Sequence, residues 1–205
     1  MLAMPPFESR AVKDPTSIGM SAAENLRYIR STIEAAHTFT TIPGKGCVAM
    51  GASAFAAAAL ESFPPLGGHW LPIWLTAAVV SCTVALFFME KKAKAQGLSL
   101  RRTVAVRFFL TLAPAFVAAA VLTVALLDSA GRDVIAGVWL LLYGVGIAAC
   151  GVFSIPLVLI AGFAFMGLGT VALAAPAAWA PVMLALGFGG IHTALGILVA
   201  RDHGG

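Results

Sequence analysis

The chain has 205 residues, of which 60% are hydrophobic and 11% are charged, and its formal net charge is +4. Soluble domains carry about 25% charged residues, so this composition excludes an ordinary soluble fold and a separate soluble catalytic domain. The net positive charge does not indicate nucleic-acid binding. The Lys and Arg residues flank long apolar runs, where they set orientation and contact anionic lipid.

Residues 1–20 contain three prolines and no hydrophobic periodicity, and they predict a flexible N-terminal tail. Residues 21–45 predict an amphipathic helix followed by a connector. Ser21 and Glu24 have the spacing of a capping box, and apolar residues then recur at steps of three and four. A helix of this length is marginal in water and needs a surface, which is either the cytoplasmic membrane interface or a partner protein.

Residues 46–201 predict a transmembrane domain, because they hold six apolar runs long enough to cross the hydrocarbon core as helices. The predicted spans are about 46–63, 69–89, 103–127, 133–152, 156–175 and 180–200, followed by a C-terminal tail at 202–205. The apolar stretch 134–175 would make a single helix of about 63 Å, which is twice the core thickness. We therefore predict a turn at 153–156, where Pro156 disfavours helix at the residue before it. The predicted fold is an all-α bundle of six transmembrane helices with an N-terminal amphipathic helix.

The distribution of charge predicts the orientation of this bundle. Every Lys and Arg except Arg132 lies on the side of the N-terminus, so the positive-inside rule places both termini in the cytoplasm. Five of these cations are predicted to lie at the membrane interface: Arg27, Arg30, Lys91, Lys92 and Arg107.

Small residues recur inside the predicted spans and indicate close contacts between helices, because small side chains let two backbones approach in lipid. The glycines predicted to pack helices together are Gly51, Gly144, Gly146, Gly167, Gly189 and Gly190.

Side chains near the outer ends of the spans are predicted to face the interface. Glu61 lies near the end of the first run, and Trp70 and Trp74 are expected to belong to an aromatic belt. Tyr143 lies deep in the fourth run and needs a hydrogen-bond partner, for which we expect a backbone carbonyl.

His192 is the one titratable residue predicted near the middle of a span, and it follows the glycine-rich segment 187–190. Two interpretations stay open. The imidazole could be the axial ligand of a haem or a chlorophyll-type pigment, or it could form a hydrogen bond across a helix contact. No second histidine is expected at the same depth, which disfavours a haem with two histidine ligands.

The sequence shows no catalytic motif. It contains no Gly-rich phosphate loop, no HExxH or GxSxG motif and no paired carboxylates. Its three cysteines form no CxxC pair and are interpreted as packing residues. We therefore predict no catalytic residues, no metal site and no enzymatic activity.

Two segments carry a family resemblance. The stretch Tyr-Ile-Arg-Ser-Thr-Ile-Glu at residues 28–34 leads to Ile-Pro-Gly-Lys-Gly at 42–46, and Gly-Gly-Ile-His at 189–192 precedes the ending Ala-Arg-Asp-His-Gly-Gly. These segments resemble the start and the close of small bacterial polytopic inner-membrane proteins of unknown function. The resemblance implies a location in the bacterial inner membrane and no particular activity.

Three functions remain open. The first is a non-catalytic accessory or scaffolding subunit of a larger membrane complex, with an energy-transducing (photosynthetic or respiratory) complex as one host. The second is a transporter or channel for a small neutral or hydrophobic solute, and the third is haem or pigment binding through His192. The expected partners are membrane lipids and other membrane-protein subunits. A solute path would be lined by Thr76, Ser81, Thr111, Tyr143, Thr170 and Thr193.

Overall fold

The computed structural model describes residues 24–26, 42–95 and 103–203, and the described residues are helical with no β-strand among them. The long helices run along the chain with short connections between them, and two short 3₁₀ turns, Gly67–His69 and Ala177–Trp179, lie in these connections. The helices are α2 (Gly44–Glu61), α3 (Trp70–Ala95), α4 (Thr103–Leu126), α5 (Arg132–Gly151), α6 (Pro156–Ala174), α7 (Ala180–Leu184), the π-helical segment η3 (Ala185–Ile191) and α8 (His192–His203).

Most of the predicted N-terminal amphipathic helix, with Arg27 and Arg30, lies outside the described residues; residues 24–26 are described and are helical. Contacts between Cα atoms divide the chain into Met1–His37 and Thr38–Gly205.

Five helical segments are long and apolar enough to cross a bilayer, so the chain is a membrane protein. They are Gly67–Ala95, Val106–Leu126, Arg132–Gly151, Pro156–Ala174 and Ala177–Asp202. Helix α2 is not among the five, because glycine, alanine, Lys45 and Glu61 make it less apolar than the others. The structure thus shows five of the six predicted spans by length and composition.

The long apolar stretch turns where Pro156 predicts. Helix α5 ends at Gly151 and α6 begins at Pro156, whose ring suits the first helical turn, while Ile155 before it is extended. Pro114 lies inside α4, and the helix continues through it.

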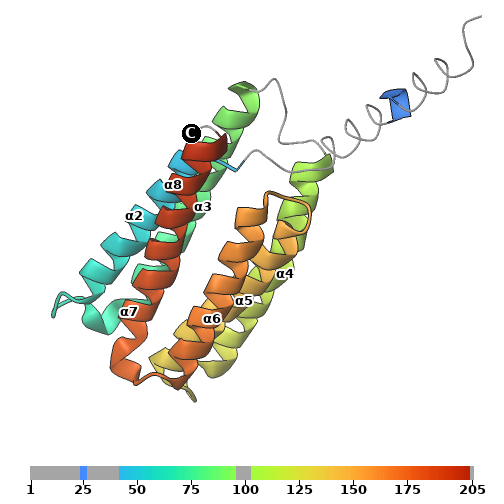
Figure 1. Cartoon of the computed structure of the whole chain (residues 1–205). Helices are drawn as coiled ribbons and strands as arrows, with labels where there is room; N and C mark the ends of the chain where they lie inside the picture. The colour runs from blue at the N-terminus through green and yellow to red at the C-terminus, as the bar shows by residue number, and fades with distance from the viewer. Residues whose placement is uncertain (1–23, 27–41, 96–102, 204–205) are drawn as a thin grey trace, which may run out of the picture. The chain divides into compact units, whose positions relative to one another are not determined.

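The helices form two layers of three (Figure 1). In the first layer, α2 lies between α3 and the last helix, which runs continuously through α7, η3 and α8. In the second layer, α5 lies between α4 and α6. We call these layers the α2 layer and the α5 layer.

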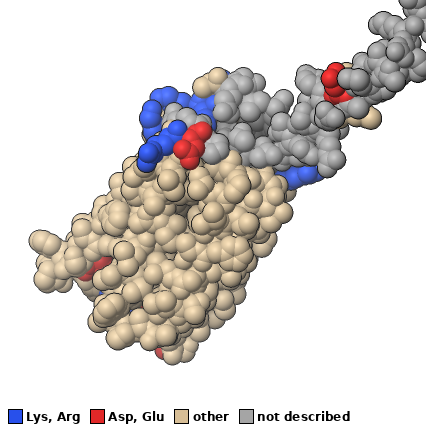
Figure 2. Space-filling model, in the orientation of Figure 1, with Lys and Arg blue, Asp and Glu red and all other residues tan. Residues whose placement is uncertain are grey.

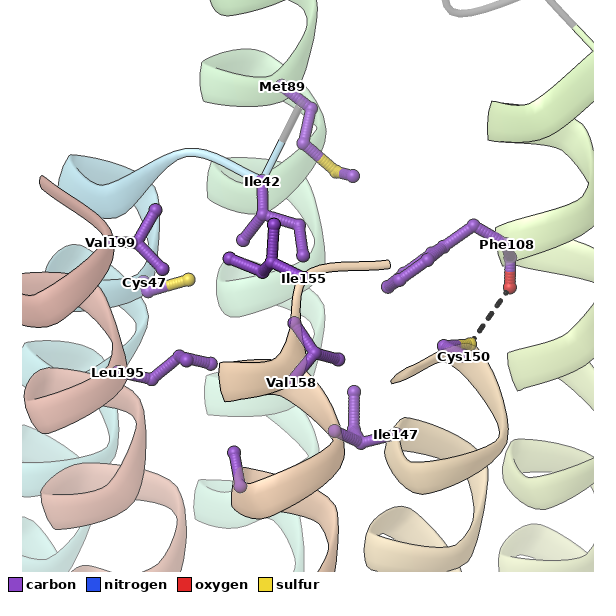
Figure 3. Packing of buried hydrophobic residues seen from close by; sticks show 11 residues of the cluster. Ile42, Cys47, Met89, Phe108, Ile147, Cys150, Ile155, Val158, Leu195 and Val199 are labelled. Carbon is purple, nitrogen blue, oxygen red and sulfur yellow. Dashed lines mark hydrogen bonds between the residues drawn. The ribbon is translucent and has the colours of Figure 1, made fainter. Parts of the chain in front are cut away.

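Two apolar clusters fill the space between the layers. Figure 3 shows one of them, in which Ile155 and Val158 of the α5 layer face Cys47, Leu195 and Val199 of the α2 layer. The other cluster lies toward the opposite end of the bundle. Its members come from both layers and include Trp74, Leu140, Phe165 and Leu184.

Glycines make the closest backbone contacts within each layer. A Cβ atom on Gly144 of α5 would lie 2.7 Å from the Gly162 carbonyl oxygen of α6, and one on Gly44 of α2 would lie 2.6 Å from the Ala200 nitrogen of α8. A Cβ atom on Gly51 of α2 would likewise lie 2.7 Å from the Gly189 carbonyl oxygen of η3. Any larger residue at these positions must push two helix backbones apart.

The other predicted packing glycines behave differently from one another. Gly146 faces α4, where a Cβ atom on it would lie 2.7 Å from the Leu112 side chain. A Cβ atom on Gly189 would lie 2.7 Å from the Phe55 ring. Gly167 and Gly190 would place a Cβ in open space, so they pack no helix of the described chain, contrary to the sequence-based expectation.

Candidate functional site

Among the described residues, Glu61 and His192 are the two buried polar or charged residues, and His192, the first residue of α8, is only 5% exposed. It follows η3, the seven-residue π-helical segment that contains Gly187, Gly189 and Gly190. π-Helical turns inside longer helices occur frequently at functional sites. We therefore treated the surroundings of His192 as the candidate site.

Both ring nitrogens of His192 have partners. Nδ1 lies 2.9 Å from the carbonyl oxygen of Phe188, one turn earlier in the same helix, and Nε2 lies 2.8 Å from the hydroxyl of Tyr143 on α5. The carbonyl oxygen can only accept a hydrogen bond, so Nδ1 carries the ring proton. Nε2 is then the acceptor, and the Tyr143 hydroxyl donates to it. The expectation that Tyr143 bonds a backbone carbonyl is wrong, because its partner is an imidazole on the other layer.

Aromatic rings enclose this hydrogen-bonded pair. Phe165 packs edge-on against Tyr143 at a centroid distance of 4.8 Å and against His192 at 5.2 Å. Phe188 is 5.2 Å from Tyr143, and Phe116 of α4 covers Tyr143 at 6.0 Å. Such edge-to-face contacts hold the two polar rings in fixed orientations.

This arrangement bears on the prediction of a haem or pigment ligand. An axial bond from Nε2 would have to replace the bond from Tyr143, and an axial bond from Nδ1 would have to replace the bond to Phe188. Ligation of a metal through either nitrogen would therefore break one hydrogen bond that His192 makes in the structure. The geometry instead fits the second interpretation, a hydrogen bond between helices.

A second polar cluster lies at the end of α2. The side chain of Glu61 is 1% exposed, and one carboxylate oxygen accepts a bond from the Arg132 guanidinium at 2.6 Å. The other carboxylate oxygen accepts a bond from the indole nitrogen of Trp74 at 2.7 Å. Glu61 is therefore enclosed by protein rather than exposed at the interface, and Trp74, which is 3% exposed, does not face lipid as an aromatic belt residue would.

Arg132 is held by three different contacts. Besides Glu61, it donates to the Gly67 carbonyl oxygen at 3.3 Å, and its guanidinium lies 5.6 Å from the centre of the Trp70 ring. Trp70 in turn packs against Trp139, whose indole nitrogen donates to Thr123 of α4 at 2.7 Å. Residues of α2, α3, α4 and α5 are thus linked at this end of the bundle.

Three of the hydroxyls predicted to line a solute path, those of Thr76, Ser81 and Thr170, bond groups within one layer. Thr76 and Thr170 are exposed and bond carbonyl oxygens of their own helices, those of Pro72 and Met166. Ser81 shares a hydrogen bond of 2.6 Å with Ser53 across the contact between α3 and α2. These hydroxyls satisfy local needs within one layer.

The described cations that were predicted at the interface differ in their exposure. Lys91 and Arg107 are exposed. Lys92 is partly buried, and its ammonium donates to the Ile42 carbonyl oxygen at 2.9 Å, so it ties the connector before α2 to α3. In the described part of the chain, all buried side-chain nitrogen and oxygen atoms have a hydrogen-bond partner, and no group of three His, Cys, Asp or Glu residues could hold a metal ion.

Comparison of the chain with models of protein families, with curated protein sequences and with solved structures gave no match. The geometry of these two clusters and the distribution of charge are therefore the observations from which a function can be argued.

Proposed function

We propose that the protein is a non-catalytic accessory or scaffolding subunit of a larger complex in the bacterial inner membrane. It crosses the membrane six times and keeps both termini in the cytoplasm. The observation that carries the proposal is that the deep polar groups are used in packing: His192 and Tyr143 bond each other, and Glu61 bonds Trp74 and Arg132. Each of these hydrogen bonds joins two helices, so the groups contribute to the packing of the bundle.

Helix α2 supports the sixth span. Its 18 residues make a helix of about 27 Å, close to the thickness of the hydrocarbon core. It runs antiparallel to α3 over its whole length, as three contacts along it show. Gly46 approaches Phe88, Ser53 bonds Ser81, and Glu61 bonds Trp74. If α3 crosses the bilayer, α2 crosses beside it.

The charges support the orientation. Figure 2 shows Lys and Arg gathered at one end of a body whose visible surface is mostly uncharged, with a few Asp and Glu atoms elsewhere on it. Among the described residues, this end holds the N-terminus of α2, the C-termini of α3 and α8 and the N-terminus of α4. Arg132 lies at the other end and is neutralised by Glu61. The positive-inside rule assigns the cationic end to the cytoplasm.

The subunit role is supported by how little of some spans the chain covers itself. In the span Val106–Leu126 the one buried residue is Phe108, and in Gly67–Ala95 the buried residues are Trp74, Met89 and Ala93. These apolar helices present long surfaces to lipid or to neighbouring membrane proteins. An energy-transducing complex is one candidate host, since such complexes contain many small helical subunits.

Purification in a gentle detergent followed by native mass measurement tests the proposal. We expect a species heavier than the single chain, containing other membrane subunits in fixed ratio. An unrelated six-span protein with the same tag, expressed at the same level, is the control for adventitious capture. A monodisperse single chain would contradict the proposal if cross-linking in the membrane before extraction also shows that no partner is lost in detergent. Reporter fusions at both termini test the topology separately.

A further inference from the structure

Three exposed cations lie at the cytoplasmic ends of three adjacent helices: Lys45 on α2, Lys91 on α3 and Arg201 on α8. Because α2 lies between α3 and α8, Lys45 lies between the other two helices. The question is whether the three side chains share one face of the α2 layer.

The buried neighbours of each cation answer this question. Cys47, Met89 and Val199 are buried in the cluster that faces the α5 layer (Figure 3). Each cation is two residues away from one of them along its helix: Lys45 from Cys47, Lys91 from Met89 and Arg201 from Val199. Two residues correspond to a rotation of about 200°, so all three cations point away from the α5 layer. We call this surface the outer face of the α2 layer.

The acidic residues at this end lie on other faces. Glu90 is paired with Lys94 at 2.8 Å, and both are adjacent in sequence to the buried Met89 and Ala93, which places them at the edge of α3. Asp202 is three residues from Val199, a rotation of about 300°, which turns it back toward the α5 layer. The outer face therefore carries three positive charges that none of these carboxylates neutralises.

Along α2, the apolar surface next to Lys45 on the outer face is made of small side chains. Ala49, Ala52, Ala56 and Ala59 lie within about 40° of Lys45 around α2, and the larger exposed Phe55 and Leu60 lie to either side of this strip. The neighbouring helices carry larger exposed side chains there, such as Phe87 on α3 and Ile197 on α8. An acyl chain can lie against the methyl groups of α2 directly below the three cations.

We propose that the outer face of the α2 layer binds an anionic phospholipid. Lys45, Lys91 and Arg201 contact its phosphate-containing headgroup, and the alanines of α2 contact an acyl chain. Charge complementarity and the position of the cations at the ends of the spans select this occupant, because cations at this level meet lipid headgroups. The inference requires that the helices cross a bilayer, and it does not depend on the proposed role as an accessory subunit.

The test is a lipid titration of the full chain in neutral detergent, read by native mass spectrometry. Phosphatidylglycerol is expected to bind more tightly than phosphatidylcholine. Each substitution Lys45→Gln, Lys91→Gln or Arg201→Gln is expected to weaken phosphatidylglycerol binding about fivefold, and the triple variant about 100-fold. Lys45→Arg should keep the affinity of the native chain.

Lys94→Gln and Arg107→Gln are the matched controls, because they remove exposed cations from the same end, one that is paired with Glu90 and one that lies on α4 in the α5 layer. Both should change the affinity by less than twofold, and elution volume and helical circular dichroism should show that every variant is folded. Equal binding of the two lipids, or equal losses in the controls, would overturn the proposal. So would displacement of the lipid by excess inorganic phosphate, which would indicate a free-anion site. Cross-linking of two chains through Ala52→Cys would instead assign the face to a second copy.

Discussion

The two layers are joined by two polar links that differ in depth and in chemistry. Near the end of α2, a buried carboxylate on Glu61 pairs with Arg132, whose side chain remains 34% exposed. Deep between the layers, the neutral pair Tyr143 and His192 makes the same kind of connection without a formal charge. Helix α5 supplies one partner to both links.

The difference follows the cost of charge at each depth. A charge near the end of a span can keep part of its hydration, as the guanidinium of Arg132 does. A charge at the centre of the bundle cannot, and there the chain uses a phenol and a neutral imidazole. The comparison therefore predicts that removing one partner of the outer link lowers the stability more than removing one partner of the deep link. It also predicts that the deep link tolerates isosteric substitution better.

Arg132→Ala gives the largest expected effect. It leaves the Glu61 carboxylate buried with Trp74 as its remaining partner, and an uncompensated buried charge costs about 3 kcal/mol of unfolding free energy. Unfolding in mixed micelles of increasing denaturing detergent measures the loss. Arg107→Ala is the matched control, because it removes an exposed arginine with no buried partner, and it should change stability by less than about 0.5 kcal/mol.

The double variant Glu61→Gln with Arg132→Met checks the cause of that loss. It removes both charges and keeps most of the volume, so much of the stability should return. A double variant as unstable as Arg132→Ala would show that packing against Trp70, rather than the buried charge, is responsible for the effect.

Tyr143→Phe is expected to cost less, about 1 kcal/mol. It removes the hydroxyl, keeps the ring contacts with Phe165 and Phe188, and leaves Nε2 of His192 without its donor. The same mixed-micelle titration measures the change, and a cycle with His192→Phe isolates the coupling between the two rings. A coupling energy of zero would mean that the two rings contribute independently and that the hydrogen bond does not join the layers.

Ser53→Ala sharpens the comparison by breaking a link within one layer. Its hydrogen bond to Ser81 joins α2 and α3, and hydrogen bonds of this kind in membranes average about 0.6 kcal/mol. We expect a loss of that size, smaller than for Tyr143→Phe. Thr76→Ala is the control, because Thr76 is exposed and bonds its own helix, and it should change stability less still.

The sequence predicted the helices better than the contacts between them. Apolar run length located the spans, and Pro156 located the turn that divides the longest run. The pairing of Glu61 with Arg132 could not be read, because the two residues are 71 positions apart and only tertiary packing brings them together. A signal was nevertheless present: Arg132 is the one cation predicted on the outer side, where Glu61, Asp128 and Asp133 are the carboxylates.

The candidate site shows the same limit. The position of His192 in a glycine-rich stretch was readable, but the π-helical register of η3 and the choice of Tyr143 as its partner depend on the other layer. The glycine contacts were partly readable, since Gly137, Gly144 and Gly151 repeat every seven residues along one face of α5. Gly167 has no such relation to its neighbours on α6 and faces open space.

Salt gives the smallest expected effect and separates the two links most directly. Because Arg132 is partly exposed, ions screen its attraction to Glu61 in part, so the loss caused by Arg132→Ala should shrink by about 0.5 kcal/mol or less between low and molar salt. The loss caused by Tyr143→Phe should not change, because neither partner is charged. Repeating both titrations at the two salt concentrations measures this. If both variants responded equally to salt, the layers would separate in the same way whichever link is broken. The depth of a link would then not determine its chemistry.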